Sequence, residues 1–233
     1  RKFEQESDHL SRLRHKNIVM VVDAFRANST SYYVMQYIDG QSLDSLIAAK
    51  GRLSTDETVG IIRQVGSALS CMHSKGMLHL DVKPANVMMA DEKTAILIDF
   101  GLSKQYDQNG QPESSTTVGS GTPGYAPIEQ ANHREGKDFP VQMDVYALGA
   151  TMLKMLTGQR PPEASDILNF GFPKKELLAV GVTSSVAMVV EKAMAPQQNK
   201  RYKTVNDFLK ALDVATIEET DIKQDSTVVD RPA

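Results

Sequence analysis

The sequence has little of several features that mark particular classes of protein. Cys71 is the only cysteine, so an internal disulfide is impossible and a reducing compartment is expected. The net charge of −3 lacks the basic excess that favours nucleic acid or an anionic membrane as partner. The best candidate for a membrane span, LLAVGVTSSVAMVV, is short and interrupted by Gly, Thr and Ser, so we expect no membrane segment. No secretory signal is visible, and we predict a cytoplasmic location.

What is present is the composition of an ordinary globular protein. Hydrophobic residues make up 41% of the chain and charged residues 24%. The length of 233 residues allows one large domain or two smaller lobes, each with its own core. Function therefore has to be inferred from local motifs and their spacing.

The first 38 residues have the pattern of one helix followed by a β-hairpin. A sparse apolar stripe predicts a helix over residues 3–14, and two strand-like runs predict strands over 18–25 and 32–38. A lone hairpin is marginally stable in water, and its unpaired edges are free to accept further strands. We therefore expect more strands of this sheet to precede residue 1.

From residue 39 onward the pattern becomes mainly helical. A capping box over 54–57 begins a helix that ends near Gly76, and a strongly apolar helix is predicted over 141–157, closed by Gly158. The other predicted segments are short strands over 87–89 and 96–98, a helix over 204–216 and a flexible acidic tail over 217–233. The whole chain is thus predicted to belong to the α+β class.

The segment LHLDVKPANVMM, residues 78–89, concentrates polar chemistry in a loop. Pro84 prevents a helix from continuing and favours an extended conformation at Lys83. In such a loop Asp81 can take or orient a hydroxyl proton, and Lys83 supplies a positive charge suited to a phosphate. The amide oxygen of Asn86 is a hard ligand of the kind that Mg²⁺ prefers.

A second carboxylate follows at the end of a buried strand. ILIDFG, residues 96–101, places Asp99 directly after three apolar residues and before Phe100 and a flexible glycine. Phosphoryl transfer requires a positioned nucleophile, neutralised phosphate oxygens and a metal held by oxygen ligands. The two segments together supply a residue for each of these tasks.

These residues resemble a known family. HLDVKPAN followed by IDFG is similar to the catalytic loop and metal-binding motif of eukaryotic-type (Hanks-type) serine/threonine protein kinases. The segments DFGLSKQYDQNG, residues 99–110, and GYAPIEQ, residues 124–130, resemble bacterial members rather than animal ones. The resemblance implies a two-lobe, protein-kinase-like α+β fold. It divides the chain into a truncated N-lobe over 1–38 (the αC helix and a hairpin), a complete, mainly helical C-lobe over 39–216, and the tail over 217–233.

The resemblance also implies a reaction. Members transfer the γ-phosphoryl group of ATP to Ser or Thr hydroxyls of protein substrates, with Mg²⁺ or Mn²⁺ as the metal cofactor. In that interpretation Asp81 and Lys83 are catalytic, and Asn86 with Asp99 binds the metal and ATP. Thr122 fits the serine/threonine class, because its hydroxyl can bridge Asp81 and Lys83. ATP and protein substrates are the expected partners, and nucleic acid is not.

Further ATP-binding residues follow from the same resemblance. Glu6 corresponds to the αC glutamate that pairs with an ATP-contacting lysine. Met35 corresponds to the gatekeeper, and Gln36 to Ile38 form the hinge whose backbone holds adenine. Met88 corresponds to the apolar floor beneath adenine. Each of these assignments is an expectation based on the position of the residue relative to the family's motifs.

Three more matches to the family concern residues that would support the loop around Asp81. GTPGYAPIEQ, residues 121–130, resembles the segment on which the substrate docks. Asp144 resembles the residue that braces the backbone of the catalytic loop, and Arg201 the arginine that pairs with Glu129. A helical lobe that carries these residues would hold the catalytic loop in one conformation.

The chain departs from the family pattern in ways that leave two rival functions open. No glycine-rich loop and no strand-three lysine precede Glu6, so the chain could be an inert pseudokinase or binding module if its upstream N-lobe is truly absent. The Asp…Asn loop is also shared by small-molecule phosphotransferases of the antibiotic type. Lys83 and the segment 121–130 favour a protein substrate.

A further departure predicts how the activity is regulated. Leu80 stands where these kinases usually carry an arginine that binds a phosphate on the activation loop. Replacing Ser114, Ser115, Thr116 and Thr117 by Ala should therefore leave most of the turnover, measured with a peptide substrate. Loss of most activity in this quadruple variant would contradict the prediction.

Overall fold

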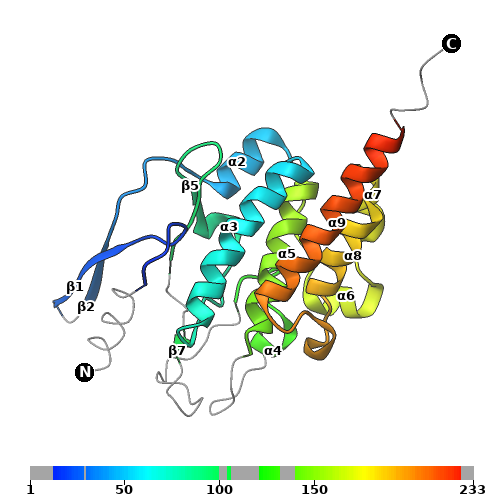
Figure 1. Cartoon of the computed structure of the whole chain (residues 1–233). Coiled ribbons are helices and arrows are strands. Elements are labelled where there is room, and N and C mark those ends of the chain that lie inside the picture. Colours follow the sequence, from blue (N-terminus) through cyan, green and yellow to red (C-terminus); the bar gives the residue numbers. More distant parts are fainter. Residues whose placement is uncertain (1–12, 29, 100–103, 106–120, 132–139, 227–233) are drawn as a thin grey trace.

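The computed structural model describes residues 13–28, 30–99, 104–105, 121–131 and 140–226 (Figure 1). A β-hairpin lies on one side of the molecule, and helices packed side by side make up the other. The predicted helix over 3–14 falls outside the described residues, apart from Leu13 and Arg14, which are not helical.

The hairpin is confirmed. Strands β1 (Val21–Ala27) and β2 (Thr30–Met35) pair antiparallel, with Phe25 opposite Tyr32 and their rings stacked. Just before β1, the backbone of Val19 donates to the carbonyl of Leu97 at 3.0 Å. This bond ties the hairpin to the strand that leads to Asp99.

A small antiparallel sheet lies beside the helices in the order β3-β5-β6. Its strands are β3 (Gln41–Ser42), β5 (Val87–Met89) and β6 (Ala95–Leu97), and a separate pair joins β4 (Met77–Leu78) to β7 (Lys104–Gln105). Gly40 precedes β3 where a Cβ atom would overlap the carbonyl of Met89. Only glycine fits this close approach, which lets the chain cross from the hairpin to the helices.

The helices begin and end where the local sequence provides caps. Helix α3 (Thr55–His73) opens with the predicted capping box, in which Ser54 and Glu57 bind each other's backbone N–H. Helix α5 (Gln142–Thr157) ends at Gly158 with φ 71°, the left-handed cap that the sequence predicted. The other helices are α2 (Leu43–Lys50), α4 (Ile128–Ala131), α6 (Ala164–Phe170), α7 (Lys174–Ala179), α8 (Ser184–Ala193) and α9 (Val205–Ser226), with 3₁₀ turns η1 (Pro84–Asn86) and η2 (Gln198–Lys200).

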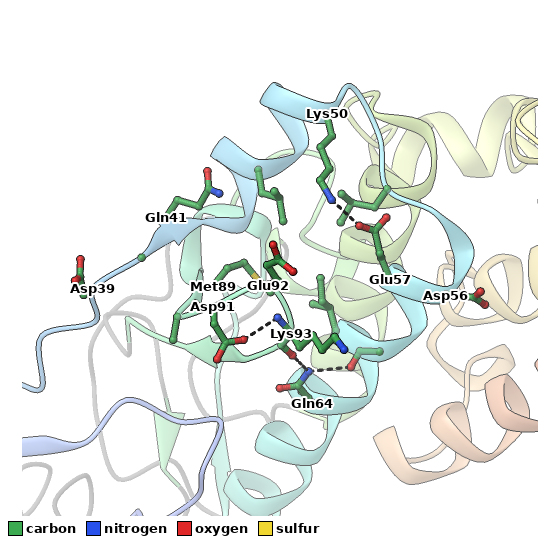
Figure 2. Close-up of a pocket in the computed structure, with 16 residues that line it drawn as sticks. Asp39, Gln41, Lys50, Asp56, Glu57, Gln64, Met89, Asp91, Glu92 and Lys93 are labelled. Atoms are coloured by element: carbon green, nitrogen blue, oxygen red, sulfur yellow. Dashed lines mark hydrogen bonds and ion pairs between the residues drawn. The ribbon is translucent and has the colours of Figure 1, made fainter.

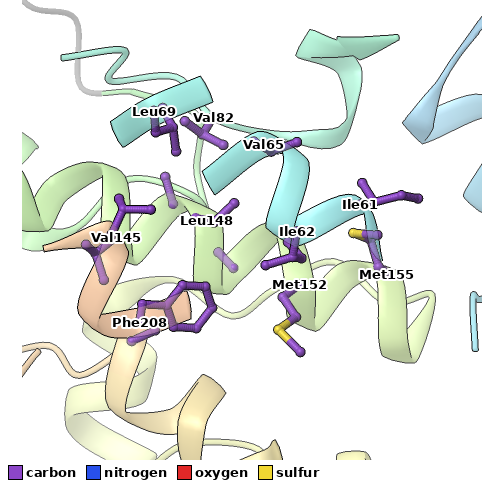
Figure 3. Packing of buried hydrophobic residues seen from close by; sticks show 14 of the residues in the cluster. Ile61, Ile62, Val65, Leu69, Val82, Val145, Leu148, Met152, Met155 and Phe208 are labelled. Atoms are coloured by element: carbon purple, nitrogen blue, oxygen red, sulfur yellow. The ribbon is translucent and has the colours of Figure 1, made fainter. Parts of the chain in front are cut away.

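The core lies where α3 and α9 pack against α5 (Figure 3). Helix α5 is buried on almost every side, which explains why its sequence is apolar all round rather than along one stripe. The fully buried side chains of this centre include Ile62, Val65, Leu69, Val145, Leu148, Met152, Met155 and Phe208. The strongly apolar helix predicted over 141–157 is thus the centre of the core.

Two segments differ from the expectation. Helix α9 continues to Ser226, so residues 217–226 are helical and the predicted flexible tail is wrong there. The reason is that the polar segment IEETDIKQDS contains neither Gly nor Pro and extends a helix that the core has already nucleated. The apolar stretch 177–190 is split at Gly181 into parts of α7 and α8, and within the described part of the chain no helix is both long and apolar enough to cross a bilayer.

Gly158, the C-cap of α5, packs closely against the carbonyl of Gly51, and the contribution of this contact to stability can be tested. A Cβ atom there would overlap the backbone carbonyl of Gly51, whereas Gly181 has φ 88° and nothing within 4 Å of such an atom. Gly158→Ala should lower the free energy of unfolding by about 3 to 5 kcal/mol, because it adds a clash to the left-handed strain. Gly181→Ala, the matched control, should cost only about 1 to 2 kcal/mol. Equal losses in denaturant titrations would contradict this assignment.

Candidate active site

The loop between β4 and β5 carries three of the candidate residues, Asp81, Lys83 and Asn86. Lys83 is extended, with φ −159° and ψ 162°, as its position before Pro84 requires. Pro84 then starts the short 3₁₀ turn η1, which the backbone N–H of Asn86 closes by donating to the carbonyl of Lys83 at 2.9 Å. This turn brings the side chains of Asp81 and Asn86 to the same place.

The Asp81 carboxylate is the centre of a dense polar cluster. Its Oδ2 atom accepts from Lys83 Nζ at 2.6 Å and from Asn86 Nδ2 at 3.0 Å. Its Oδ1 atom accepts from the hydroxyl of Thr122 at 2.6 Å, and Lys83 Nζ also donates to that hydroxyl at 2.8 Å. The predicted bridge from Thr122 to Asp81 and Lys83 is therefore confirmed. The side chains of Asp81 and Lys83 are 13% and 24% exposed, so the cluster is open to an incoming group.

Asp99 is brought to this cluster by the pairing of β5 with β6. The backbone N–H of Ile98 donates to the carbonyl of Asn86 at 2.9 Å, so the next residue, Asp99, lies beside the end of η1. Asp99 has φ 64°, a left-handed conformation that is unusual for a residue other than glycine. Strain of this kind at the end of a buried strand is typical of functional positions.

The donor set around Asn86 suits a hard divalent cation. The Nδ2 atom of Asn86 donates to both the backbone carbonyl and the carboxylate of Asp81. Its amide oxygen and the Asp99 carboxylate are oxygen ligands of the type that Mg²⁺ prefers. Among the described residues, no group of three or more His, Cys, Asp and Glu side chains forms a cage for a metal.

The buried ring of His79 connects the loop that carries Asp81 with the strand end that carries Asp99. The backbone N–H of Asp81 donates to Nδ1 of His79 at 3.3 Å, so Nε2 carries the proton and donates to the carbonyl of Ile98 at 3.2 Å. Burial lowers the pKa of His79, although the nearby carboxylates of Asp144, Asp81 and Asp99 oppose that shift. A neutral ring therefore links the backbone that leads to Asp81 with the backbone that leads to Asp99. From the family resemblance the sequence placed His79 in a stacked spine that links the lobes, but these two hydrogen bonds were not predicted.

Asp144, in the first turn of α5, supports the loop that begins at His79. Its buried carboxylate accepts the backbone N–H of His79 at 2.9 Å and that of Leu80 at 2.8 Å. His73 Nε2, at the end of α3, lies 2.7 Å from the same carboxylate. Burial alone would raise the pKa of Asp144, but the bonds and charges of His73 and His79 outweigh it and lower that pKa. The predicted bracing of the loop by Asp144 is confirmed.

Segment 121–130 contacts Asp81 through Thr122 near its start, and an ion pair anchors it near its end. Arg201, whose side chain is fully buried, binds both carboxylate oxygens of Glu129, as the sequence predicted. The same guanidinium donates to the backbone carbonyls of Gln142, Ala195 and Pro196. A planar, five-donor group is needed to satisfy so many acceptors at once.

The positions expected around adenine are only partly described. Met35 ends β2 with 43% of its surface exposed, and the backbone N–H of Gln36 donates to the carbonyl of Met20 at 2.9 Å. Ile38 and Met88 are half-buried, and Met88 pairs with Ser42 in the small sheet. Glu6 lies outside the described residues, so its pairing stays a prediction.

A separate cavity of about 1140 Å³ opens between α2, the start of α3 and the turn after β5 (Figure 2). Acidic side chains lie around it with two lysines, and Lys50 pairs with Glu57 at 2.6 Å. Asp91 at the same turn accepts the backbone N–H of Lys93. None of the predicted site residues lines this cavity, so it is distinct from the cluster around Asp81.

Comparison with known proteins identifies the class. The family model described as protein kinase domain matches residues 1–219. The chain therefore belongs to the protein kinase family, and the resemblance read from its motifs is confirmed. The crystal structure of Rad53 1–466 in complex with AMP-PNP is similar with a TM-score of 0.73 at 21% identity, covering 91% of this chain and 54% of that one. This likeness confirms the expected kinase fold.

Curated relatives are bacterial kinases. The probable serine/threonine-protein kinase PknB of Lactococcus lactis is 31% identical over 235 residues, which is 98% of this chain and 36% of the relative. The serine/threonine-protein kinase PknB of Mycobacterium tuberculosis is 28% identical over 218 residues, or 89% of this chain and 34% of the relative. This chain thus spans about a third of the length of the curated relatives it matches.

The contribution of the Arg201–Glu129 ion pair to the stability of segment 121–130 can be tested by a conservative change. Arg201→Lys should lower the free energy of unfolding by about 2 to 4 kcal/mol, because lysine cannot satisfy Glu129 and three carbonyls together. The matched control is Arg63→Lys, where Arg63 and Asp213 form a pair that is 50% and 49% exposed. That change should cost less than about 1 kcal/mol. If urea unfolding shows similar losses of unfolding free energy in both variants, the buried guanidinium of Arg201 has no special role in stability.

Proposed function

We propose that the chain is the catalytic part of a serine/threonine protein kinase, which transfers the γ-phosphoryl group of ATP to a Ser or Thr hydroxyl of a protein. The observation that carries this proposal is the cluster in which the Asp81 carboxylate receives Thr122, Lys83 and Asn86 at 2.6 to 3.0 Å. The hydroxyl of Thr122 marks a position from which an alcohol can donate to Asp81 while it contacts the Lys83 ammonium. A substrate hydroxyl has the same chemistry.

The transfer step uses these groups in a simple way. The oxygen of the substrate hydroxyl forms a bond to the γ-phosphorus, and the bond from that phosphorus to the bridging oxygen of ADP breaks. Asp81 orients the hydroxyl and accepts its proton, while Lys83 neutralises charge on the transferring group. Asn86 and Asp99 would hold Mg²⁺, or Mn²⁺, which supplies positive charge to the phosphate oxygens when bound.

The remaining assignments follow the family pattern. We place adenine against Met88, with Met35 beside it and the backbone of Gln36 to Ile38 along its edge. Glu6 would pair with a lysine of the N-lobe that contacts ATP. The choice of Ser and Thr over Tyr is supported by Lys83, by its bond to Thr122, and by the names of the bacterial relatives.

Two other functions are less well supported. An inert binding module has no need for the intact cluster of Lys83 and Asn86 around the partly exposed carboxylate of Asp81. A small-molecule phosphotransferase has no need for a docking segment that a buried ion pair between Glu129 and Arg201 holds against the lobe. Both observations favour a protein kinase.

The central test is Asp81→Asn, which keeps the shape of the side chain and removes its charge. Turnover with peptide substrates should fall by about 10²- to 10⁴-fold, because the hydroxyl loses its base, while ATP affinity and the unfolding midpoint stay close to those of the wild type. Asp91→Asn, in the exposed turn after β5, is the matched control and should keep full turnover. Peptides with Ser, Thr and Tyr at the acceptor position test the substrate class. Undiminished transfer by the Asp81 variant would overturn the proposal.

A further inference from the structure

The peptide bond that leads into Asp81 is held at both edges by buried side chains from different segments. Its carbonyl, on Leu80, accepts a hydrogen bond from Gln130 Nε2 at 2.7 Å. Its N–H, on Asp81, donates to His79 Nδ1 at 3.3 Å. A peptide unit is planar, so fixing both edges fixes the position of the Asp81 Cα atom, from which the side chain starts.

This peptide needs to be held, because the backbone before it is strained. Leu80 has φ 64°, in the left-handed region that a leucine rarely adopts, and its side chain is 2% exposed. Conformations of this kind cost about 1 to 3 kcal/mol and persist only where the surroundings impose them. Asp144 imposes the turn from the N–H side of Leu80, at 2.8 Å, and Gln130 imposes it from the carbonyl side.

The site of the Gln130 amide is specifically shaped. Gln130 is 2% exposed, although glutamine is usually a surface residue. Gly121 has φ 70°, and a Cβ atom there would lie 2.8 Å from Gln130 Nε2 and 2.5 Å from the Cβ of Ala126. The neighbouring Glu129 is fixed by Arg201, so helix α4 cannot shift to relieve a poor contact. The loop thus leaves room for this amide and for little else.

We propose that Gln130 is a positioning residue for Asp81, which couples the docking segment to the catalytic loop through a neutral, buried hydrogen bond. This inference rests on the proposed kinase function and adds a route by which the ordered docking segment supports catalysis. Thr122 contacts the Asp81 side chain directly, whereas Gln130 acts on the backbone one residue earlier. Because an amide donor and a carbonyl acceptor carry no net charge, this coupling requires no phosphate.

The test is Gln130→Met, which keeps the length of the side chain and removes its donor. In the intact protein we expect kcat to fall by about 10- to 100-fold, since a small misplacement of a catalytic group costs this much, while the KM for ATP stays unchanged. Gln64→Met is the matched control: Gln64 Nε2 also donates to backbone carbonyls, those of Gly60 and Lys93, and its Oε1 accepts from Asn17 and Ala95, so none of these four bonds goes to residues 79–86. Its kcat should equal that of the wild type.

A double variant separates positioning from general loss of structure. If Gln130 acts through Asp81, then adding Gln130→Met to Asp81→Asn should change turnover by less than about twofold, because the two residues act as a unit. If the two losses multiply, or if Gln130→Met alone keeps the wild-type kcat, the inference is wrong. A wild-type protein without phosphotransfer would instead overturn the proposed function, so the two failures are distinguishable.

A second variant keeps the inference testable if Gln130→Met does not fold. Gln130→Glu has the same shape, but its carboxylate repels the Leu80 carbonyl, whereas the protonated acid can donate to it. Burial favours the protonated form, so kcat relative to the wild type should rise as the pH falls from about 8 to about 6. A ratio that stays at the level of Gln130→Met at every pH in this range would contradict the role of a donor at this position.

Discussion

The buried carboxylate of Asp144 is the constraint on which the arrangement of the site depends. It accepts two successive backbone N–H groups, from His79 and Leu80, and a third contact from His73. A charge inside a helical core is costly unless hydrogen bonds satisfy it, and here the catalytic loop itself provides them. The loop is therefore held in its strained turn because another conformation would remove two of the buried carboxylate's three partners and leave only His73.

The candidate active site is built outward from this support in layers of decreasing burial. His79 links the loop to the strand before Asp99, and Gln130 fixes the carbonyl that precedes Asp81. Only at the surface of this arrangement does a partly exposed charged pair appear, that of Asp81 with Lys83. Preorganisation of this kind lets charged groups meet a substrate without reorganising, which is how polar sites stabilise phosphoryl transfer.

Much of the fold and of the site could be predicted from the sequence because the relevant signals are local. The capping box at Ser54, the left-handed cap at Gly158 and the apolar spacing in α5 each involve neighbouring residues, and each prediction is confirmed. The contacts of Thr122 and Asp144 were also predicted, from their place in motifs of a known family. The end of α9 was predicted wrongly, because a polar segment can continue a helix once the packed part has nucleated it.

The sequence by itself determined which chemical groups are available: two carboxylates, an amide and an ammonium at a spacing that suits a phosphate and a metal. Only the tertiary structure decided which neutral groups hold them, namely the His79 ring and the Gln130 amide. The physical reason is that both act by hydrogen bonds to backbone atoms. A backbone carbonyl or N–H is the same at every residue, so no side-chain pattern marks which one a distant glutamine or histidine will bind. That choice follows from the strained turn at Leu80, which the packing of α5 beneath the loop imposes.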